Sequence, residues 1–201
     1  TFMTLAAEEG YKLGRKCKEL GTKVIMGGSH VSFLPDEALG NGADFVVRKE
    51  GFQTLPELTE ALEQGKEDFS HILGLSWKDA KGEHIHNPDR PFSTQEEFEE
   101  LPIPDIKLLD GYGNATSIAV YTQIGCPERC EFCSVVQMCP KIRYRLTESI
   151  LDEVEQLCRI YGPGVEIFFC SDNFFAHKRQ AKELLRGIVK RKLVARGGLQ
   201  M

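Results

Sequence analysis

Short, mainly apolar runs alternate along the chain with segments whose apolar residues recur at helical spacing. The apolar runs predict buried strands at residues 23–26, 44–47, 117–122 and 165–170. A helical repeat between two of them carries Ile150, Val154, Leu157 and Tyr161. Strands that alternate with helices through short loops predict parallel strands covered by helices, so the expected fold class is α/β.

The amino-terminal half adds three local predictions. Apolar residues predict a first helix, which carries Ala6, Leu13, Cys17 and Leu20. The pattern Thr54-Leu55-Pro56-Glu57 is typical of a capping box and predicts that another helix starts there. Residues 73–77 and 83–86 predict an exposed hairpin, with His84 and His86 on one side of it.

Prolines concentrate between residues 87 and 113, where the composition becomes typical of a loop. We therefore expect a first domain at 1–86, a linker at 87–113 and a second domain at 114–201. The first residue lies close to a predicted helix, and residues 193–196 look like a strand without a partner. We expect the sequence to be a piece of a longer protein that is inactive on its own.

Charge and cysteine content narrow the class of protein. The 201 residues carry a net charge of −5, which argues against nucleic acid as an electrostatic partner. The chain has seven cysteines, an odd number. This count suits a protein of a reducing compartment such as the cytoplasm better than a protein held by a disulfide framework. No apolar run approaches the roughly 20 residues of a membrane span, so none is expected.

Cys126, Cys130 and Cys133 stand at spacing Cys-x3-Cys-x2-Cys, directly after the strand predicted at 117–122. They therefore belong to a loop at the carboxyl end of a strand, where parallel α/β sheets place their chemistry. Three thiolates can hold a soft metal centre, and three ligands on a cubane cluster would leave one iron open. The alternatives are a structural zinc site with Cys139, a redox pair of Cys130 and Cys133, and a ferredoxin-like electron carrier.

This spacing, with Phe132 before the third cysteine, resembles the radical S-adenosylmethionine superfamily. The resemblance implies a 4Fe–4S cluster held by the three cysteines, with S-adenosylmethionine on the fourth iron and Phe132 beside its adenine. It also implies that Asp172 and Asn173, after the strand at 165–170, bind the amino group of S-adenosylmethionine. A helix-capping role is the alternative for Asp172. We expect Cys170 to pack within its strand, and Arg143 and Arg145 to be solvated.

The first half resembles part of the Rossmann-like cobalamin-binding domain found in cobalamin-dependent members of this superfamily. The resemblance rests on Thr1-x-Met3, Gly27-Gly28-x-His30 and Glu50-Gly51. It implies contacts to the nucleotide tail of cobalamin, which we assign to Thr1, Gly27, Gly28, Ser29, His30 and Glu50. Two adjacent glycines also suit a tight turn, and we expect His30 to be a hydrogen-bonding loop histidine and not a cobalt ligand.

Together the resemblances imply a partial Rossmann-like cobalamin-binding domain followed by the first part of a radical S-adenosylmethionine (β/α) partial barrel. The implied activity is reductive cleavage of S-adenosylmethionine to a 5′-deoxyadenosyl radical. Cobalamin-dependent methyl transfer to an unactivated carbon, or ring formation or rearrangement, would follow. The implied partners are a small-molecule, lipid or tetrapyrrole-type substrate and an electron donor such as flavodoxin or ferredoxin. No catalytic acid or base can be assigned.

Overall fold

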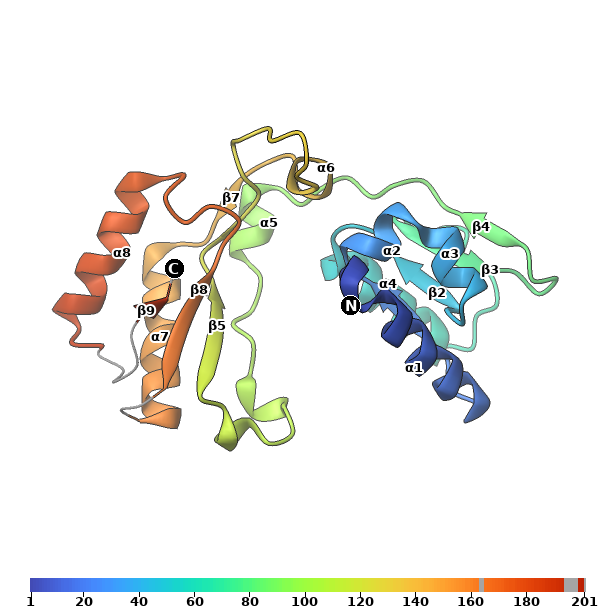
Figure 1. Cartoon of the computed structure of the whole chain (residues 1–201), viewed down its shortest axis with the longest axis horizontal. Helices are drawn as coiled ribbons and strands as arrows, with labels where there is room; N and C mark the ends of the chain where they lie inside the picture. The colour runs from blue at the N-terminus through green and yellow to red at the C-terminus, as the bar shows by residue number, and fades with distance from the viewer. Residues whose placement is uncertain (163–164, 194–198, 201) are drawn as a thin grey trace. The chain divides into compact units, whose positions relative to one another are not determined.

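The chain forms two compact units, Thr1–Phe92 and Ser93–Met201 (Figure 1). The structure, a computed structural model, describes residues 1–162, 165–193 and 199–200. The strand predicted at 193–196 lies almost entirely outside these residues. Among the described helices, none is both long and apolar enough to cross a bilayer.

The first unit contains one sheet of four strands in the order β1-β2-β3-β4. Its elements are η1 (Thr4–Ala6), α1 (Ala7–Glu19), β1 (Ile25–Gly27), α2 (Ser29–Phe33), α3 (Pro35–Gly40), β2 (Phe45–Val47), α4 (Gly51–Glu63), β3 (Leu75–Lys78) and β4 (His84–His86). β1 and β2 are parallel as predicted, whereas β3 and β4 run antiparallel to their neighbours. The sheet is therefore mixed, because the hairpin folds back onto the open edge of β2.

The prediction of an exposed hairpin is wrong for β3. Leu75, Ser76 and Trp77 of β3 are buried, and the strand pairs with β2 along its length. β4 forms the edge of the sheet, where Asp36 of α3 contacts both histidines. The hairpin pattern was correct, but sequence alone did not show that a free strand edge would recruit it.

The two faces of β2 explain the layers of this unit. Val46 packs with residues of α1, α2 and α3 on one face, while Phe45 and Val47 pack with α4 and β3 on the other. All three strand residues are buried, as expected for a strand that helices cover on both sides. The expectation that helices cover these strands is thus correct for this unit.

α4 begins earlier than the capping box predicted. The helix starts at Gly51, so Pro56 lies inside it and removes one intrahelical hydrogen bond. Thr54 is fully buried, and its hydroxyl donates to Leu73 O and accepts from Arg90 Nε. The local pattern predicted that Thr54 caps the helix, but its side chain makes tertiary contacts instead.

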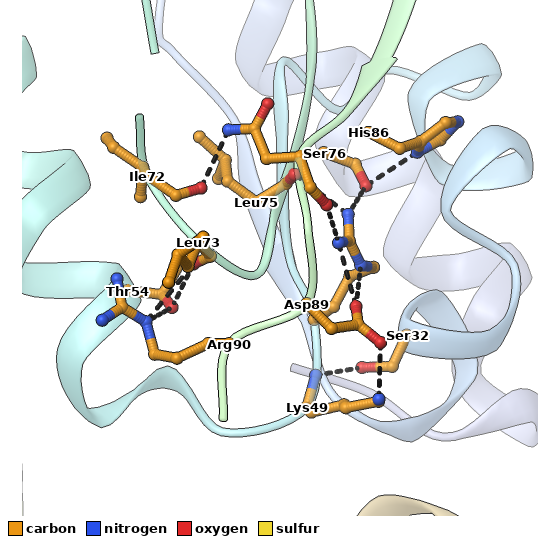
Figure 2. A network of polar contacts seen from close by, with 12 residues as sticks. Ser32, Lys49, Thr54, Ile72, Leu73, Leu75, Ser76, His86, Asp89 and Arg90 are labelled. Atoms are coloured by element: carbon orange, nitrogen blue, oxygen red, sulfur yellow. Dashed lines mark hydrogen bonds and ion pairs between the residues drawn. The ribbon is translucent and has the colours of Figure 1, made fainter. Parts of the chain in front are cut away.

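A polar network fixes residues 87–92, the start of the predicted linker, onto the first unit (Figure 2). Buried Arg48, just after β2, donates to the carbonyl oxygens of Leu75 and Asn87 and to Asp89. Lys49 Nζ lies 2.7 Å from Asp89 Oδ2, and this hydrogen bond is the main reason that the pKa of Asp89 is lowered. The chain leaving β4 is therefore held at the carboxyl end of β2.

The second unit is built on two parallel strands covered by two helices. Its elements are α5 (Gln95–Glu99), η2 (Ile106–Leu108), η3 (Tyr112–Asn114), β5 (Ser117–Tyr121), β6 (Gln123–Ile124), α6 (Val135–Met138), β7 (Arg143–Tyr144), α7 (Thr147–Tyr161), β8 (Glu166–Cys170), α8 (Lys178–Lys190) and β9 (Leu199–Gln200). The sheet has the order β5-β8-β9, and both pairings are parallel. This is the strand–helix–strand–helix arrangement that the sequence predicted.

One face of the β5–β8 pair forms the core of the second unit. Ile118 and Val120 of β5 and Ile167 and Phe169 of β8 pack against residues of α7 and α8. The alternating residues of β5, which include Tyr121, are exposed on the other face. Because β5 and β8 are parallel, their carboxyl ends lie at the same edge of the sheet. Helices cover one face of this strand pair, and the other face is open.

Candidate functional site

The three clustered cysteines lie on one loop at the carboxyl end of the sheet. The cysteine loop, residues 125–134, connects β6 to α6. Cys126 and Cys133 are half-buried, Cys130 is exposed, and all three are free thiols. Inside the loop, Cys133 N donates to Cys130 O at 3.0 Å. The predicted cluster residues therefore sit where the sequence placed them.

Polar groups of the chain segments that follow β5 and β8 form hydrogen bonds with one another. The hydroxyl groups of Thr122 and Ser171 are in hydrogen-bond contact. Gln123 is 2% exposed, and its Nε2 donates to Asn173 O at 2.6 Å. We call residues 122–123 and 171–173 the polar seam. It fixes the two chain segments that leave the sheet relative to each other.

Asp172 and Asn173 use the seam to hold the start of the cysteine loop. Gly125 N donates to Asp172 Oδ2 at 2.6 Å, and Asn173 Nδ2 lies 3.8 Å from Cys126 Sγ. The alternative role of Asp172 as a helix cap is wrong, because His177 occupies the N-cap of α8. The structure thus brings both predicted S-adenosylmethionine residues to the cysteine loop.

Gly125 has a conformation and surroundings that exclude a side chain. Its φ of +87° lies in the region that favours glycine. A Cβ built there would stand 2.8 Å from Lys141 O and 3.0 Å from Cys139 O. The chain that returns from the loop therefore packs against its start, a constraint that the sequence analysis missed although the glycine directly precedes Cys126.

The thiols suit an iron–sulfur cluster by their chemistry, although they do not converge in this structure. Among the described residues, no group of three or more His, Cys, Asp or Glu side chains is placed to hold a metal ion. Free, accessible thiols on one loop are nevertheless the ligands that iron–sulfur clusters use. Phe132 is 94% exposed beside them. The donor set fits the cluster by its chemistry.

Three further residues of this region differ from expectation. Cys170 lies on the open face of β8, because Ile167 and Phe169 take the core-facing positions. It stands opposite Tyr121 in the sheet, and their hydrogen bond is the main reason that the pKa of Tyr121 is raised. Arg143 and Arg145 are not solvated, since Arg143 is 2% exposed and Arg145 pairs with buried Glu153.

In the first unit, the structure brings Thr1, Gly27 and Gly28 together at the carboxyl end of β1. Phe2 N donates to Gly27 O at 3.2 Å. Gly28 has a φ of +104°, and a Cβ there would stand 2.8 Å from Phe2 O. The glycines therefore admit the backbone of Phe2, and Thr1 Cγ2 would stand 3.4 Å from a Cβ at Gly27.

The other predicted cobalamin residues lie near the same edge of the sheet. Ser29 begins α2, and Glu50 is half-buried directly before α4. His30 lies on α2 and not on a loop, and its ring nitrogens contact Thr4 Oγ1 at 3.2 Å and Tyr11 OH at 3.1 Å. It is thus a hydrogen-bonding histidine, as expected, but it is buried and helical.

Tyr11 should make the stability of the first unit depend on alkaline pH. Burial, followed by the charge of Glu37, raises the pKa of Tyr11 from 10.0 to about 12. Because the unfolded phenol ionises first, its contribution to stability is present below pH 10 and is lost as the pH rises towards 12. We expect urea unfolding of Tyr11→Phe to lack this part of the pH dependence. Tyr112→Phe is the matched control, and an unchanged profile in Tyr11→Phe would contradict the prediction.

The sequence is similar to those of several known proteins. No protein-family model matches the chain. It is 35% identical to an uncharacterized methyltransferase of Pyrococcus horikoshii, over 92% of this chain and 41% of the relative. It is 24% identical to the anaerobic magnesium-protoporphyrin IX monomethyl ester cyclase of Rubrivivax gelatinosus, over 96% of this chain and 36% of the relative. The chain thus spans less than half the length of these relatives.

Solved structures show the same fold. The cobalamin-dependent S-adenosylmethionine radical enzyme OxsB with aqua-cobalamin superposes with a TM-score of 0.70 at 22% identity, over 94% of this chain and 28% of that chain. The radical S-adenosylmethionine methyltransferase TsrM of Kitasatospora setae, with cobalamin and a [4Fe-4S] cluster, also gives 0.70 at 22% identity, over 93% and 37%. The chain therefore has the fold of these two enzymes over part of their length, and it is similar in sequence to relatives described as an uncharacterized methyltransferase and as a cyclase.

Proposed function

We propose that this chain is part of a radical S-adenosylmethionine enzyme that also binds cobalamin. One observation carries the proposal: three free thiols stand on a loop whose start is held by Asp172 and Asn173 at the carboxyl ends of two parallel strands. In a parallel α/β sheet, this edge is where ligands bind. The homology to proteins described as cobalamin-dependent radical enzymes supports the same conclusion.

In this proposal, Cys126, Cys130 and Cys133 hold a 4Fe–4S cluster. When bound, the cluster and S-adenosylmethionine supply a one-electron cleavage that yields a 5′-deoxyadenosyl radical. Asp172 uses Oδ2 to fix Gly125, and its Oδ1 would accept a hydrogen bond from the amino group of S-adenosylmethionine. Asn173 would orient the same group, and exposed Phe132 would close over the adenine.

The first unit would bind the nucleotide tail of cobalamin. Thr1, Gly27 and Gly28 form a narrow corner at the end of β1, and Ser29, His30 and Glu50 follow at neighbouring positions of the same edge. His30 would support this edge through Thr4 and Tyr11 and would not bind cobalt. In this proposal, the compact unit Thr1–Phe92 corresponds to the domain predicted at 1–86.

The relatives favour methyl transfer as the reaction of the whole protein. Two of them carry the description methyltransferase at 35% and 33% identity. Others are described as acting on a bacteriochlorophyllide or a hopanoid, so a tetrapyrrole-type or lipid substrate is the proposal. Ring formation is the second candidate, which the magnesium-protoporphyrin cyclase supports. A flavodoxin or ferredoxin would supply the electron.

Anaerobic reconstitution with iron and sulfide tests the proposal. We expect a broad visible charge-transfer band and a reduced-cluster signal in electron paramagnetic resonance that changes when S-adenosylmethionine is added. A cluster that ignores S-adenosylmethionine would indicate an electron carrier instead. Stoichiometric zinc without sulfide would indicate a structural metal module.

A further inference from the structure

The cysteine loop and α6 lie between β6 and β7, which pair as a very short two-stranded ribbon. β6 leads directly into Gly125, and β7 receives the chain after α6. The ribbon consists of the pairs Gln123–Tyr144 and Ile124–Arg143. Two-stranded ribbons are marginally stable in water even when they are longer than this. Contacts from outside the ribbon must therefore hold it in place.

Gln95, in the first turn of α5, supplies one such contact. Its Nε2 donates to Tyr144 O at 2.6 Å, and Tyr144 N donates to its Oε1 at 3.0 Å. A carboxamide has a donor and an acceptor like the peptide group, so this side chain reproduces the hydrogen bonds of a neighbouring strand. Gln95 thus takes the place of a third strand beside β7.

Arg143 supplies the second contact from the same segment. It is 2% exposed, and its Nη1 donates to Ser93 O at 3.0 Å and to Ser93 Oγ at 2.6 Å. Its guanidinium lies over the ring of buried Phe98, 5.8 Å from the centroid. Because an unpaired buried donor is costly, these two hydrogen bonds of Nη1 hold β7 against Ser93.

The segment itself has a rigid beginning. Thr94 and Glu97 form a reciprocal capping box, in which Thr94 Oγ1 accepts from Glu97 N and Glu97 Oε2 accepts from Thr94 N. Since the helix has a fixed start, Gln95 reaches Tyr144 from a defined position. A displacement of β7 would in turn shift Lys141 and Ile142, against which Gly125 packs.

We propose that Gln95, Arg143 and Ser93, here called the α5 clamp, are positioning residues for the cysteine loop and for S-adenosylmethionine. They act through β7, β6 and Gly125 on Cys126, and they need not touch the cluster or its ligand. The inference rests on the function proposed above. It assigns a role to a segment that lies within the predicted linker at 87–113.

Gln95→Ala in the full chain tests the α5 clamp, with exposed Glu96→Gln on the same helix as the matched control. After reconstitution, S-adenosylmethionine is titrated against the electron paramagnetic resonance signal of the reduced cluster, and iron, sulfide and circular dichroism are measured in parallel. We expect native circular dichroism and an apparent Kd about tenfold higher than in the parent chain, equivalent to about 1.4 kcal/mol. Glu96→Gln should titrate like the parent.

A purely structural role would lower the unfolding temperature of Gln95→Ala without changing the titration, and that result would overturn the proposal. If Gln95→Ala does not fold, Ser93→Ala, which removes one acceptor of Arg143, is titrated instead with the same expected direction. A parent chain that assembles no cluster would refute the proposed function itself, which keeps the two failures distinct.

Discussion

Cys130→Ala should abolish the iron–sulfur cluster of the reconstituted chain. Cys130 is the exposed member of the three thiols, and a cubane that already lacks a fourth protein ligand would be left with two. We expect the visible charge-transfer band and the bound iron and sulfide to fall to the level of a chain without a site. Absorbance and metal analysis after anaerobic reconstitution measure the effect.

Cys17→Ala is the matched control, because it removes a free, half-buried thiol from α1 in the other unit. It should retain the full cluster. Retention of iron and sulfide by Cys130→Ala would show that the trio is not the ligand set. Loss of metal in Cys139→Ala together with stoichiometric zinc would favour the closed, four-ligand alternative.

Gly125→Ala should be the most damaging substitution in the cysteine loop that leaves every thiol in place. An alanine at a φ of +87° is strained by about 1–2 kcal/mol. Its Cβ would also meet backbone atoms at 2.8 Å and 3.0 Å, which cannot move aside like a flexible side chain. We expect Cys126 to be displaced and the cluster content to drop several-fold, as measured by iron and sulfide analysis.

Gly111→Ala separates strain from collision. Gly111 has a φ of +70°, but the nearest atom to its added Cβ is Asn114 Nδ2 at 4.0 Å. The control should therefore lose stability by the strain alone, visible in urea unfolding, and keep its cluster. Equal cluster content in the two variants would contradict the idea that the packing of Lys141 on Gly125 sets the loop.

The sequence predicted the strand–helix order because hydrophobic spacing is a local property. β1, β2, β5 and β8 all lie at the predicted runs. The capping box at Thr54 was wrong, because Leu73 and Arg90 compete for its hydroxyl. A local pattern thus fails where the fold brings a distant segment within reach of its side chain.

The partners of charged and polar side chains were the hardest feature to predict from the sequence. The loop-like surroundings of Arg143 in the sequence predict a solvated side chain, yet its partner Ser93 is 50 residues away in the chain. Arg48 likewise reaches Asp89, which is 41 residues away. Such pairs leave no periodic signal, since each depends on which segments the fold brings together.

The sequence by itself determined the α/β alternation, the cysteine spacing and the position of the cysteines after a strand, because each follows from residues close together in the chain. Only the tertiary structure decided that β3 and β4 complete the first sheet, that Asp172 and Asn173 hold the start of the cysteine loop, and that residues 93–98 support β7. These features join segments that are distant in the chain. They arise because unpaired strand edges and buried polar groups must find hydrogen-bond partners, wherever the fold supplies them.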